Sequence, residues 1–435
     1  MTIISGFSKL ERSQKINYLL EHSNLNLDDC ICFREFDAPG KEAQQVLEEM
    51  TENYICNFPV PMGVVTNMIL NGENISVPFV TEESSVVAAA SKAAKFWASR
   101  GGFKAVVLST TKKGQVHFTW KGMPETILTL FPSIREKLML SVAKMTESMR
   151  NRGGGITEIQ LIDKTSELTD YYQLDVSFET AEAMGANFIN SCLETFATVL
   201  RDTPELNSAD HKVETILSVL SNYTPDCKVN CRVECSVEEM AGWYGNLSGN
   251  AFAQKFRQAV DIANLDVSRA VTHNKGIFNG IDAVIVATGN DWRAVSASAN
   301  AYASRNGRYS ALTSINLSEG VFRYELELPL AVGTVGGVTH IHPVVKKSMA
   351  IMNNPDVRKL MMIAAASGLA NNFAAIASLI TTGIQNGHMR LHLTNILSQM
   401  NANQAEREQA ISYFQHNLVS FATVGDYIRK LRKEP

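Results

Sequence analysis

The stretch that decides the fold is THNKGIFNGIDAVIVATGNDWRA, which runs from Thr272 to Ala294. Its centre, IDAVIVAT, is an apolar run whose length and β-branched content predict a strand buried on both faces. Lys275 precedes the run in a glycine-bearing turn, and Asp291 follows it in a second turn. An ammonium held poorly solvated against a buried strand can stabilise negative charge on a reacting oxygen, and Asp291 would keep it protonated. The simpler alternatives are a lysine that snorkels from a loop and an aspartate in an Asx turn.

The composition limits the classes of protein to consider. A chain of 435 residues exceeds one ordinary core, which indicates two or three domains. Charged residues make up 19%, hydrophobic residues 45%, and the formal net charge is −4. These values predict a globular protein without a polyanion-binding surface, so we expect no nucleic-acid partner. The N-terminus, MTIISGFSKLERSQK, has no apolar core of signal-peptide length, so we do not expect secretion.

The cysteines indicate a reducing compartment. There are seven of them, with no CxxC pair. In CKVNCRVECSV, Cys227, Cys231 and Cys235 share one face with Val229 and Val233 at period two. This alternation predicts a half-buried strand that uses cysteine as a small hydrophobic residue. We therefore expect a cytoplasmic protein, with no disulfide or metal chemistry at these positions.

One segment, residues 360–384, is apolar enough to resemble a membrane span. Its sequence is LMMIAAASGLANNFAAIASLITTGI, with Asn371 and Asn372 at the middle. A lipid-exposed amide would be costly there, and the richness in Ala, Ser and Gly suits close packing inside protein. We predict a buried helix and no membrane association.

The order of predicted elements divides the chain. Residues 1 to about 60 predict short amphipathic helices, and VTEESSVVAAASKAAKFWASRGG predicts a helix that begins at Glu82 and Glu83. From about 103 to 236 the pattern is strand, helix, two strands, helix, strand, and the cysteine-bearing strand comes last. This split βαβ arrangement predicts an inserted domain. An α/β pattern then returns, and roughly the last fifty residues predict polar helices without an obvious core, which suits a mobile cap.

The common motifs of nucleotide and metal sites are missing from the sequence. Neither GxGxxG nor the P-loop pattern occurs, but EAMGAN (182–187) opens a predicted helix and RGGG (152–155) follows another. Small residues at such positions leave backbone amides free to hold an anion. His388 and His392 are spaced as a pair on one helix face. No further metal ligand can be identified for this pair or for the histidines of THIHP. We therefore expect no metal.

Seven blocks of the sequence, taken in order, resemble class II hydroxymethylglutaryl-CoA (HMG-CoA) reductases. The resemblance runs from about Glu52 through the histidine segment, in the blocks VTEESSVVAAAS, RGGG, EAMGANFIN, THNKGIFNGIDAVIVATGNDWRA, GTVGGVTHIHP, GLANNFAAIASL and TGIQNGHM. It implies an HMG-CoA reductase, which reduces (S)-HMG-CoA by four electrons to (R)-mevalonate and CoA. Two NAD(P)H are consumed, and the intermediates are a hemithioacetal and mevaldehyde.

The resemblance also implies a fold of mixed α+β and α/β class with several domains. The expected parts are a large mixed α/β domain, an inserted ferredoxin-like (split βαβ) nucleotide-binding domain, and a helical C-terminal flap. The large substrate-binding and dimerisation domain would comprise residues 1–108 and 221–376, the small dinucleotide-binding domain 109–220, and the flap 377–435. The small domain would explain the missing GxGxxG. The family further implies a homodimer with active sites at the interface.

The resemblance assigns roles that spacing alone does not. The catalytic residues would be Glu83, Lys275, Asp291 and His388. Lys275 would stabilise the oxyanion, Glu83 would pass a proton in the second reduction, and His388 would protonate the departing CoA thiolate. The substrate-binding residues would be Ser85, Arg269, Asn279 and Asn222. The cofactor-binding residues would be Thr146, Arg150, Arg152, Gly153, Gly154, Glu182, Met184, Gly185, Ala186, Asn187 and Asn190.

Four positions depart from the family pattern. Ser84 stands where proline is common, and Cys56 stands where glycine would be expected. Glu182 replaces the aspartate of DAMGAN, and Asn371 replaces the glutamine of GLAQN. None of these changes removes a catalytic group, so we expect them to affect affinity and local rigidity more than activity.

The cofactor preference is predicted from the helix before RGGG. NAD-using relatives carry an aspartate seven residues before GGG, which accepts hydrogen bonds from the ribose 2′-hydroxyl and repels a 2′-phosphate. Thr146 occupies that position here, and Arg150 and Arg152 follow it. A 2′-phosphate would meet donors and positive charge, so we expect NADPH to be favoured over NADH. Glu147 argues the other way, but on a helix it points about 100° away from Thr146.

Two other functions are compatible with the same sequence. The first is a different CoA-thioester reductase or lyase on the same scaffold, and the second is a catalytically silent CoA-binding protein. The intact set of Glu83, Lys275, Asp291 and His388 favours an active reductase.

Overall fold

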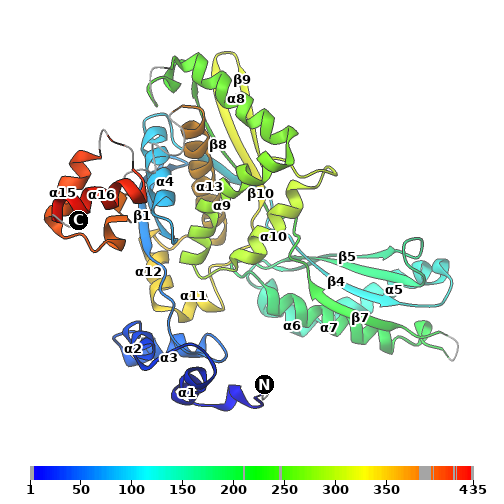
Figure 1. The fold of residues 1–435 in the computed structure, drawn as a ribbon. Coiled ribbons are helices and arrows are strands. Elements are labelled where there is room, and N and C mark those ends of the chain that lie inside the picture. The colour runs from blue at the N-terminus through cyan, green and yellow to red at the C-terminus, as the bar shows by residue number, and fades with distance from the viewer. Residues whose placement is uncertain are drawn as a thin grey trace.

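The computed structural model describes residues 4–208, 211–243, 247–381, 393–394, 396–414, 417 and 419–432. Figure 1 shows a mixed α/β protein in which a smaller α/β part projects from a larger one. N-terminal helices lie at one end of the large part, and C-terminal helices lie along its side. The N-terminal helices are α1 (Arg12–His22), α2 (Leu27–Glu35) and α3 (Lys41–Glu49).

The large part is built on an antiparallel sheet of order β3-β8-β10-β9, beside the hairpin β1-β2. Its strands are β1 (Met62–Leu70), β2 (Glu73–Val80), β3 (Lys104–Val107), β8 (Lys228–Ser236), β9 (Thr313–Ser318) and β10 (Val321–Pro329). Its helices are α4 (Ser84–Ala98), α8 (Gly249–Leu265), α9 (Val267–Ala287), α10 (Trp292–Ala303), α11 (Val338–Ile341), α12 (Pro343–Ile351) and α13 (Val357–Leu379). One continuous core joins the sheet to α4, α9 and α13.

The prediction of a buried strand at IDAVIVAT is wrong, because the run belongs to helix α9. Helix α9 packs against α13, β2 and α8, and most of its residues beyond Ile277 are buried. A helix covered on most sides shows no apolar stripe, so periodicity cannot distinguish it from a buried strand. Lys275 consequently lies within a helix and not in a turn.

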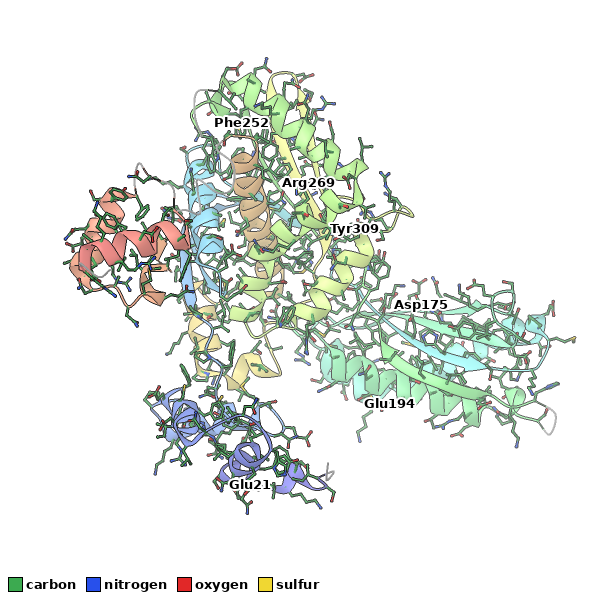
Figure 2. The ribbon with its side chains drawn as sticks, in the orientation of Figure 1. Glu21, Asp175, Glu194, Phe252, Arg269 and Tyr309 are labelled. Atoms are coloured by element: carbon green, nitrogen blue, oxygen red, sulfur yellow. The ribbon has the colours of Figure 1, made fainter. Side chains whose placement is uncertain are left out.

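The smaller part is an antiparallel sheet of order β5-β6-β4-β7. Its elements are β4 (Lys112–Thr119), α5 (Pro124–Ser141), α6 (Ala143–Arg150), β5 (Gly155–Asp163), β6 (Tyr171–Glu179), α7 (Ala186–Asp202) and β7 (Glu214–Leu220). A separate hydrophobic core fills the space between this sheet and its helices. Figure 2 places Asp175 and Glu194 in this part, away from Arg269 in the large part.

The cysteine-bearing strand does not close the smaller part, which corrects a prediction made from the sequence. That strand is β8, and it pairs with β3 and β10 in the large sheet. Its predicted alternation is confirmed, since Val229, Cys231 and Val233 are buried. The strand that ends the smaller part is β7. Residues 103–120 likewise contain two strands that belong to different sheets, β3 and β4.

The C-terminal helices have a small core, contrary to the sequence-based expectation. Residues on α15 (Gln404–Tyr413), α16 (Phe421–Arg432) and the stretch before them pack together. Its buried members are Leu393, Ile396, Leu397, Ala402, Ala410, Phe414, Val424 and Ile428. Separation of these residues along the chain hides the core from local pattern analysis.

Helix α13 confirms the prediction of a buried helix at the apolar segment. Within the part of the chain that the structure describes, it is the one helix long and apolar enough to span a membrane, and 89% of its apolar window is buried inside the protein. Asn371 and Asn372 are both buried on it.

The contact between α9 and α13 depends on a glycine. A Cβ atom built on Gly280 would lie 2.2 Å from the Ser367 carbonyl oxygen of α13. A Cβ atom on Gly276, one turn earlier, would have its nearest neighbour, Asn372 Nδ2, at 3.4 Å. Of these two glycines, Gly280 is therefore the one at which the backbones of α9 and α13 come close together.

We predict that Gly280→Ala lowers the free energy of unfolding by about 1–3 kcal/mol or more, because α9 and α13 must separate to admit the methyl group. Gly276→Ala is the matched control. It should be neutral or stabilising by up to about 1 kcal/mol, because alanine is the better helix former. Denaturant unfolding of both variants measures the difference. Equal effects of the two substitutions would contradict the proposed contact.

Candidate active site

A cleft of about 440 Å³ lies between α4, α9 and α13. Five residues singled out in the sequence line it: Glu83, Ser85, Arg269, Lys275 and Asn279. Glu83 is the N-cap residue of α4, as its place before the alanine-rich helix predicts. The other side of the cleft is formed by α13, including Asn371 and Asn372.

Glu83 and Lys275 form an ion pair across the cleft. The Lys275 Nζ lies 3.8 Å from Glu83 Oε2, and the Ser85 hydroxyl donates to Glu83 Oε1. The Thr81 hydroxyl oxygen accepts from the Glu83 backbone N–H at 3.2 Å. The glutamate is thus oriented from three sides by residues of its own helix start and by α9.

The ion pair is more exposed than the sequence suggested. The Lys275 side chain is 65% exposed and that of Glu83 is 42% exposed. The expectation of a poorly solvated lysine is therefore not met in a single chain. In water such a pair contributes little to stability, which suits a pair retained for binding or chemistry.

Arg269 supplies a second cation one and a half turns before Lys275 on α9. Burial lowers the pKa of its guanidinium, although an arginine stays protonated at any ordinary pH. Across the described residues no carboxylate lies within ion-pair distance of it. The cleft therefore offers an arginine fork suited to a carboxylate or phosphate ligand.

A buried hydrogen-bond network supports the floor of the cleft. Asn372 Nδ2 donates to the His273 carbonyl at 2.7 Å, so Asn372 Oδ1 accepts from the Tyr324 hydroxyl. The Tyr324 hydroxyl has one proton, and it donates this proton to Asn372. In the 3.0 Å contact between Thr313 and Tyr324, the Thr313 hydroxyl is therefore the donor. Thr313 Oγ1 must then accept from His273 Nε2, at 2.6 Å.

The network fixes the tautomer of His273. With Nε2 protonated and the ring neutral, Nδ1 is an unprotonated acceptor, and it is buried without a hydrogen-bond partner among the described residues. Burial, together with the nearby charge of Arg269, lowers the pKa of His273 to about 3. The ring therefore stays neutral throughout the ordinary pH range.

Two residues that line the cleft, His273 and Lys92, were not predicted from the sequence. His273 lies in the quoted stretch but was not singled out, because its partners come from β9, β10 and α13. Lys92 also lines the cleft, with its Nζ 5.1 Å from the Trp243 ring centroid. The sequence could have indicated Lys92, because it follows Ser85 by seven residues on a predicted helix, which places both residues on one face.

Asp291 does not join this cleft in the same chain. It is the N-cap residue of α10, where its carboxylate accepts from the backbone N–H of Arg293 and Ala294. Its side chain is 46% exposed. Lys275 lies twelve residues before the end of α9, a rise of about 18 Å along the axis. The expectation that Asp291 orients Lys275 across a strand is therefore wrong within one chain.

Asn222 also lies away from the cleft. It borders a cavity of about 10 Å³ at the junction of the two α/β parts, together with Met184 and the buried Lys112. Thr224 lines the same cavity, and its hydroxyl is buried without a partner among the described residues. A space of this size accommodates one water molecule.

The residues proposed for the adenosine end of the cofactor lie on and after α6. Thr146 is only 4% exposed, and its hydroxyl donates to the Val142 carbonyl at 2.9 Å. Glu147, by contrast, is exposed, in agreement with the predicted helical geometry. Arg150 and Arg152 are exposed, and Gly153 and Gly154 form the turn into β5.

The EAMGAN turn connects β6 to α7, as its predicted place at a helix start requires. Gly185, with φ 95°, is the N-cap residue of α7, and Ala186 and Asn187 begin the helix. Asn190 Oδ1 accepts from the Leu220 N–H at 2.8 Å, which ties α7 to β7. Glu182 Oε2 accepts from the Thr334 hydroxyl at 2.5 Å and from the Val357 N–H at 2.9 Å.

His388 and His392 lie outside the described residues. His342 is the N-cap residue of α12, where its Nδ1 accepts from the Val344 N–H at 3.2 Å, and burial lowers its pKa. Over the described ranges, no group of three or more His, Cys, Asp or Glu side chains is arranged to hold a metal ion.

Comparisons with known proteins identify a family. The family model for hydroxymethylglutaryl-coenzyme A reductase matches residues 12–393. The 3-hydroxy-3-methylglutaryl-coenzyme A reductase of Archaeoglobus fulgidus is 31% identical over 411 residues, which cover 94% of this chain and 89% of that protein. The probable reductase of the same name from Borreliella burgdorferi is 31% identical over 432 residues, covering 98% of this chain and 94% of its own.

Solved structures give the same family. A 3-hydroxy-3-methylglutaryl-coenzyme A reductase from Streptococcus pneumoniae superimposes with a TM-score of 0.73 at 32% identity, covering 98% of this chain and all of that one. The class II enzyme from the same organism, bound to NADPH in open conformations, gives a TM-score of 0.71 at 33% identity, covering 87% of this chain and all of that one.

We predict that His273 makes the protein less stable in acid. Its folded pKa, about 3, lies below the ordinary value of 6.5, so only the unfolded state binds a proton between these pH values. Stability should fall as the pH drops below about 6.5, with a slope of up to about 1.4 kcal/mol per pH unit from this group. His273→Gln should remove that slope.

Asp282 has the opposite effect on the pH dependence of stability, because burial raises its pKa to about 6. The measurement is therefore the difference in the free energy of unfolding between wild type and variant, from denaturant unfolding at pH 7, 6 and 5. Parallel pH profiles would contradict the assignment.

Proposed function

The chain belongs to the hydroxymethylglutaryl-coenzyme A reductase family, and we propose that the cleft between α4, α9 and α13 is its substrate site. It is a class II member, an NAD(P)H-dependent oxidoreductase that reduces HMG-CoA to mevalonate. The observation that carries the placement is the Glu83–Lys275 pair, set in one cleft with Ser85, Arg269 and Asn279.

Lys275 would be the electrophilic residue. The reduced nicotinamide, when bound, supplies the hydride to the thioester carbonyl carbon. Negative charge then develops on the carbonyl oxygen, and an ammonium already in position stabilises it more than water would. Lys275 would act from beside Glu83, where its Nζ lies 3.8 Å from Glu83 Oε2.

Glu83 would handle the proton of the second reduction. Reducing mevaldehyde to mevalonate requires a proton on the aldehyde oxygen as hydride arrives at its carbon. Glu83 faces Lys275 and accepts from the Ser85 hydroxyl, so a proton can be exchanged within this group of three. His388 would protonate the CoA thiolate as it leaves, on a C-terminal flap comprising residues 377–435.

Arg269 would hold the carboxylate end of the substrate, with Ser85 and Asn279 as polar neighbours. Arg269 has no carboxylate partner among the described residues, so its guanidinium is suited to bind the free carboxylate of an HMG group. Its position before Lys275 on one helix sets the carboxylate and the reacting carbonyl at different points along the cleft.

We assign residues 109–220 to a ferredoxin-like dinucleotide-binding domain and 1–108 with 221–376 to the large domain. The support is the strand order β5-β6-β4-β7, the two helix connections and a separate hydrophobic core. The dinucleotide would lie across the RGGG turn and the start of α7, with the Asn222 cavity near its junction with the substrate. The cytoplasm is the proposed location.

NADPH is the preferred cofactor in this proposal. The buried side chain of Thr146 does not face solvent, so the preference rests on Arg150 and Arg152, which are exposed beside the RGGG turn. Both can pair with a 2′-phosphate.

A homodimer would complete the site. Lys275 and Asp291 of one chain do not meet, and both side chains are about half exposed or more. A second copy that brought its Asp291 to this cleft would bury the lysine and give it a further carboxylate.

We predict that the protein oxidises NADPH in the presence of HMG-CoA, with a higher kcat/KM for NADPH than for NADH. Arg152→Ala should raise the KM for NADPH by about tenfold, an effect of about 1.4 kcal/mol, and change that for NADH little. Arg135→Ala, an exposed arginine on α5, is the control of equal charge. Nicotinamide absorbance measures all three. Absence of turnover would refute the function, whereas a preference for NADH would refute only the cofactor assignment.

We also predict that two inactive variants restore each other. Lys275→Ala and Asp291→Asn should each lose turnover, because each lacks one half of a shared site. Heterodimers made by co-expression would contain one site with both wild-type residues, so a random mixture should recover roughly a quarter of wild-type activity. No recovery in purified heterodimers would place both residues in the site of one chain.

A further inference from the structure

The EAMGAN turn of the small part is bound to the large part through one carboxylate. A single oxygen, Glu182 Oε2, accepts both the Thr334 hydroxyl and the Val357 backbone N–H, at 2.5 and 2.9 Å. Thr334 lies in the GTVGG loop after β10, and Val357 is the first residue of α13. The proposed cofactor turn and the long buried helix of the substrate cleft thus share this group.

The Val357 amide explains why a carboxylate suits this position. The first amides of a helix have no partner within the helix, and they carry its partial positive charge. Asp356, the N-cap residue of α13, accepts from the Lys359 N–H and leaves the Val357 N–H to another acceptor. Glu182 supplies that acceptor from the other α/β part.

The backbone of the turn fits the same loop closely. The Thr334 N–H donates to the Glu182 carbonyl at 2.8 Å, and Ala183 forms a parallel bridge with Val335. A Cβ atom on Gly333 would lie 2.4 Å from the Met184 nitrogen. The turn therefore has little freedom to shift while these contacts hold.

Helix α13 carries the contact to the substrate cleft. It begins at Val357 beside Glu182, and Ile376 and Leu379 near its other end line the cleft that holds Lys275. It is buried along its length against the large core. A rigid helix thus joins the Glu182 contact to one wall of the cleft.

We propose that Glu182 is a positioning residue that sets the distance between the bound dinucleotide and the substrate, and that its carboxylate is not a ligand of the cofactor. The inference rests on the proposed dinucleotide site at this turn. Both donors converge on Oε2, so the group is already engaged. An aspartate, the residue expected at this position from the family pattern, is shorter by one methylene group and would not reach both donors from the same backbone.

Two substitutions separate positioning from cofactor binding. Glu182→Gln keeps the length of the side chain, and its carbonyl oxygen can still accept from both donors, so kcat should stay within about threefold of wild type. Glu182→Asp keeps the charge but moves the carboxylate away from the two donors. The kcat should fall at least about tenfold, because misplacing the dinucleotide by an ångström relative to the substrate costs that much or more. The dissociation constant for NADPH, measured by protein fluorescence without substrate, should change less than twofold in both.

A cofactor ligand would give the reverse order. If the carboxylate accepted a hydrogen bond from the dinucleotide, aspartate would be tolerated, and glutamine would raise the dissociation constant for NADPH. Either that order, or full kcat in Glu182→Asp, would overturn the proposal.

Thr334→Val supplies an independent measurement, because it removes one donor and leaves Glu182 unchanged. It should lower kcat, and the double variant with Glu182→Asp should lose less than the product of the two single effects, since both act on one contact. Multiplicative effects would overturn the proposal. Thermal unfolding of each variant checks that the fold persists, and turnover by the wild type tests the proposed function separately.

Discussion

The structure depends on the close approach of α9 to α13. Gly280 admits the Ser367 carbonyl at a distance no side chain would allow, and the Asn372 amide then reaches the His273 carbonyl on the same face. The approach at Gly280 fixes the spacing of the two helices, and the hydrogen bond from Asn372 to His273 fixes their rotation. Helix α9 carries Arg269, Lys275 and Asn279, which all line the cleft, and its packing against α13 contributes to their alignment with Glu83. A change in the helix contact would therefore move three functional groups together.

The charges of the cleft follow from this arrangement. Three cations, Lys92, Arg269 and Lys275, line the cleft with one carboxylate, Glu83. His273 stays neutral because burial and the charge of Arg269 both disfavour its protonation. An excess of positive charge suits a substrate with a free carboxylate and a carbonyl oxygen that becomes negative. The same excess is tolerated here because the charged groups are partly exposed. Closing the cleft with a second chain or with the C-terminal segment would strengthen each interaction by removing water.

Much of this arrangement could be predicted from the sequence where the signal was local. The start of α4 at Glu83 followed from acidic residues before an alanine-rich run, and the alternation of β8 followed from period two. Long-range features could not be predicted in this way. The run IDAVIVAT is a helix buried on most sides, which looks like a strand in the sequence. Strand β8 pairs with one strand more than eighty residues away and with another more than a hundred residues away. The His273 network draws on four elements, so no local pattern contains it. The resemblance predicted a set of site residues, of which Glu83, Ser85, Arg269, Lys275 and Asn279 line one cleft, whereas the separation of Lys275 from Asp291 follows from the length of α9.

The two glutamates near the proposed reaction illustrate how surroundings decide a role. Glu83 is partly exposed, its neighbours are a hydroxyl and an ammonium, and both of its oxygens face the cleft. Such a carboxylate can exchange a proton. Glu182 has one oxygen committed to two donors from the large part, one of them the first amide of a long buried helix. Releasing it would leave a buried N–H unsatisfied, at a cost of about 1–3 kcal/mol. Hydride transfer requires that the small part, which would carry the dinucleotide, keep a fixed distance from the cleft of the large part. Apolar surfaces resist separation but allow sliding, whereas a carboxylate shared by two directed donors resists both, and Glu182 provides that constraint where the two parts meet.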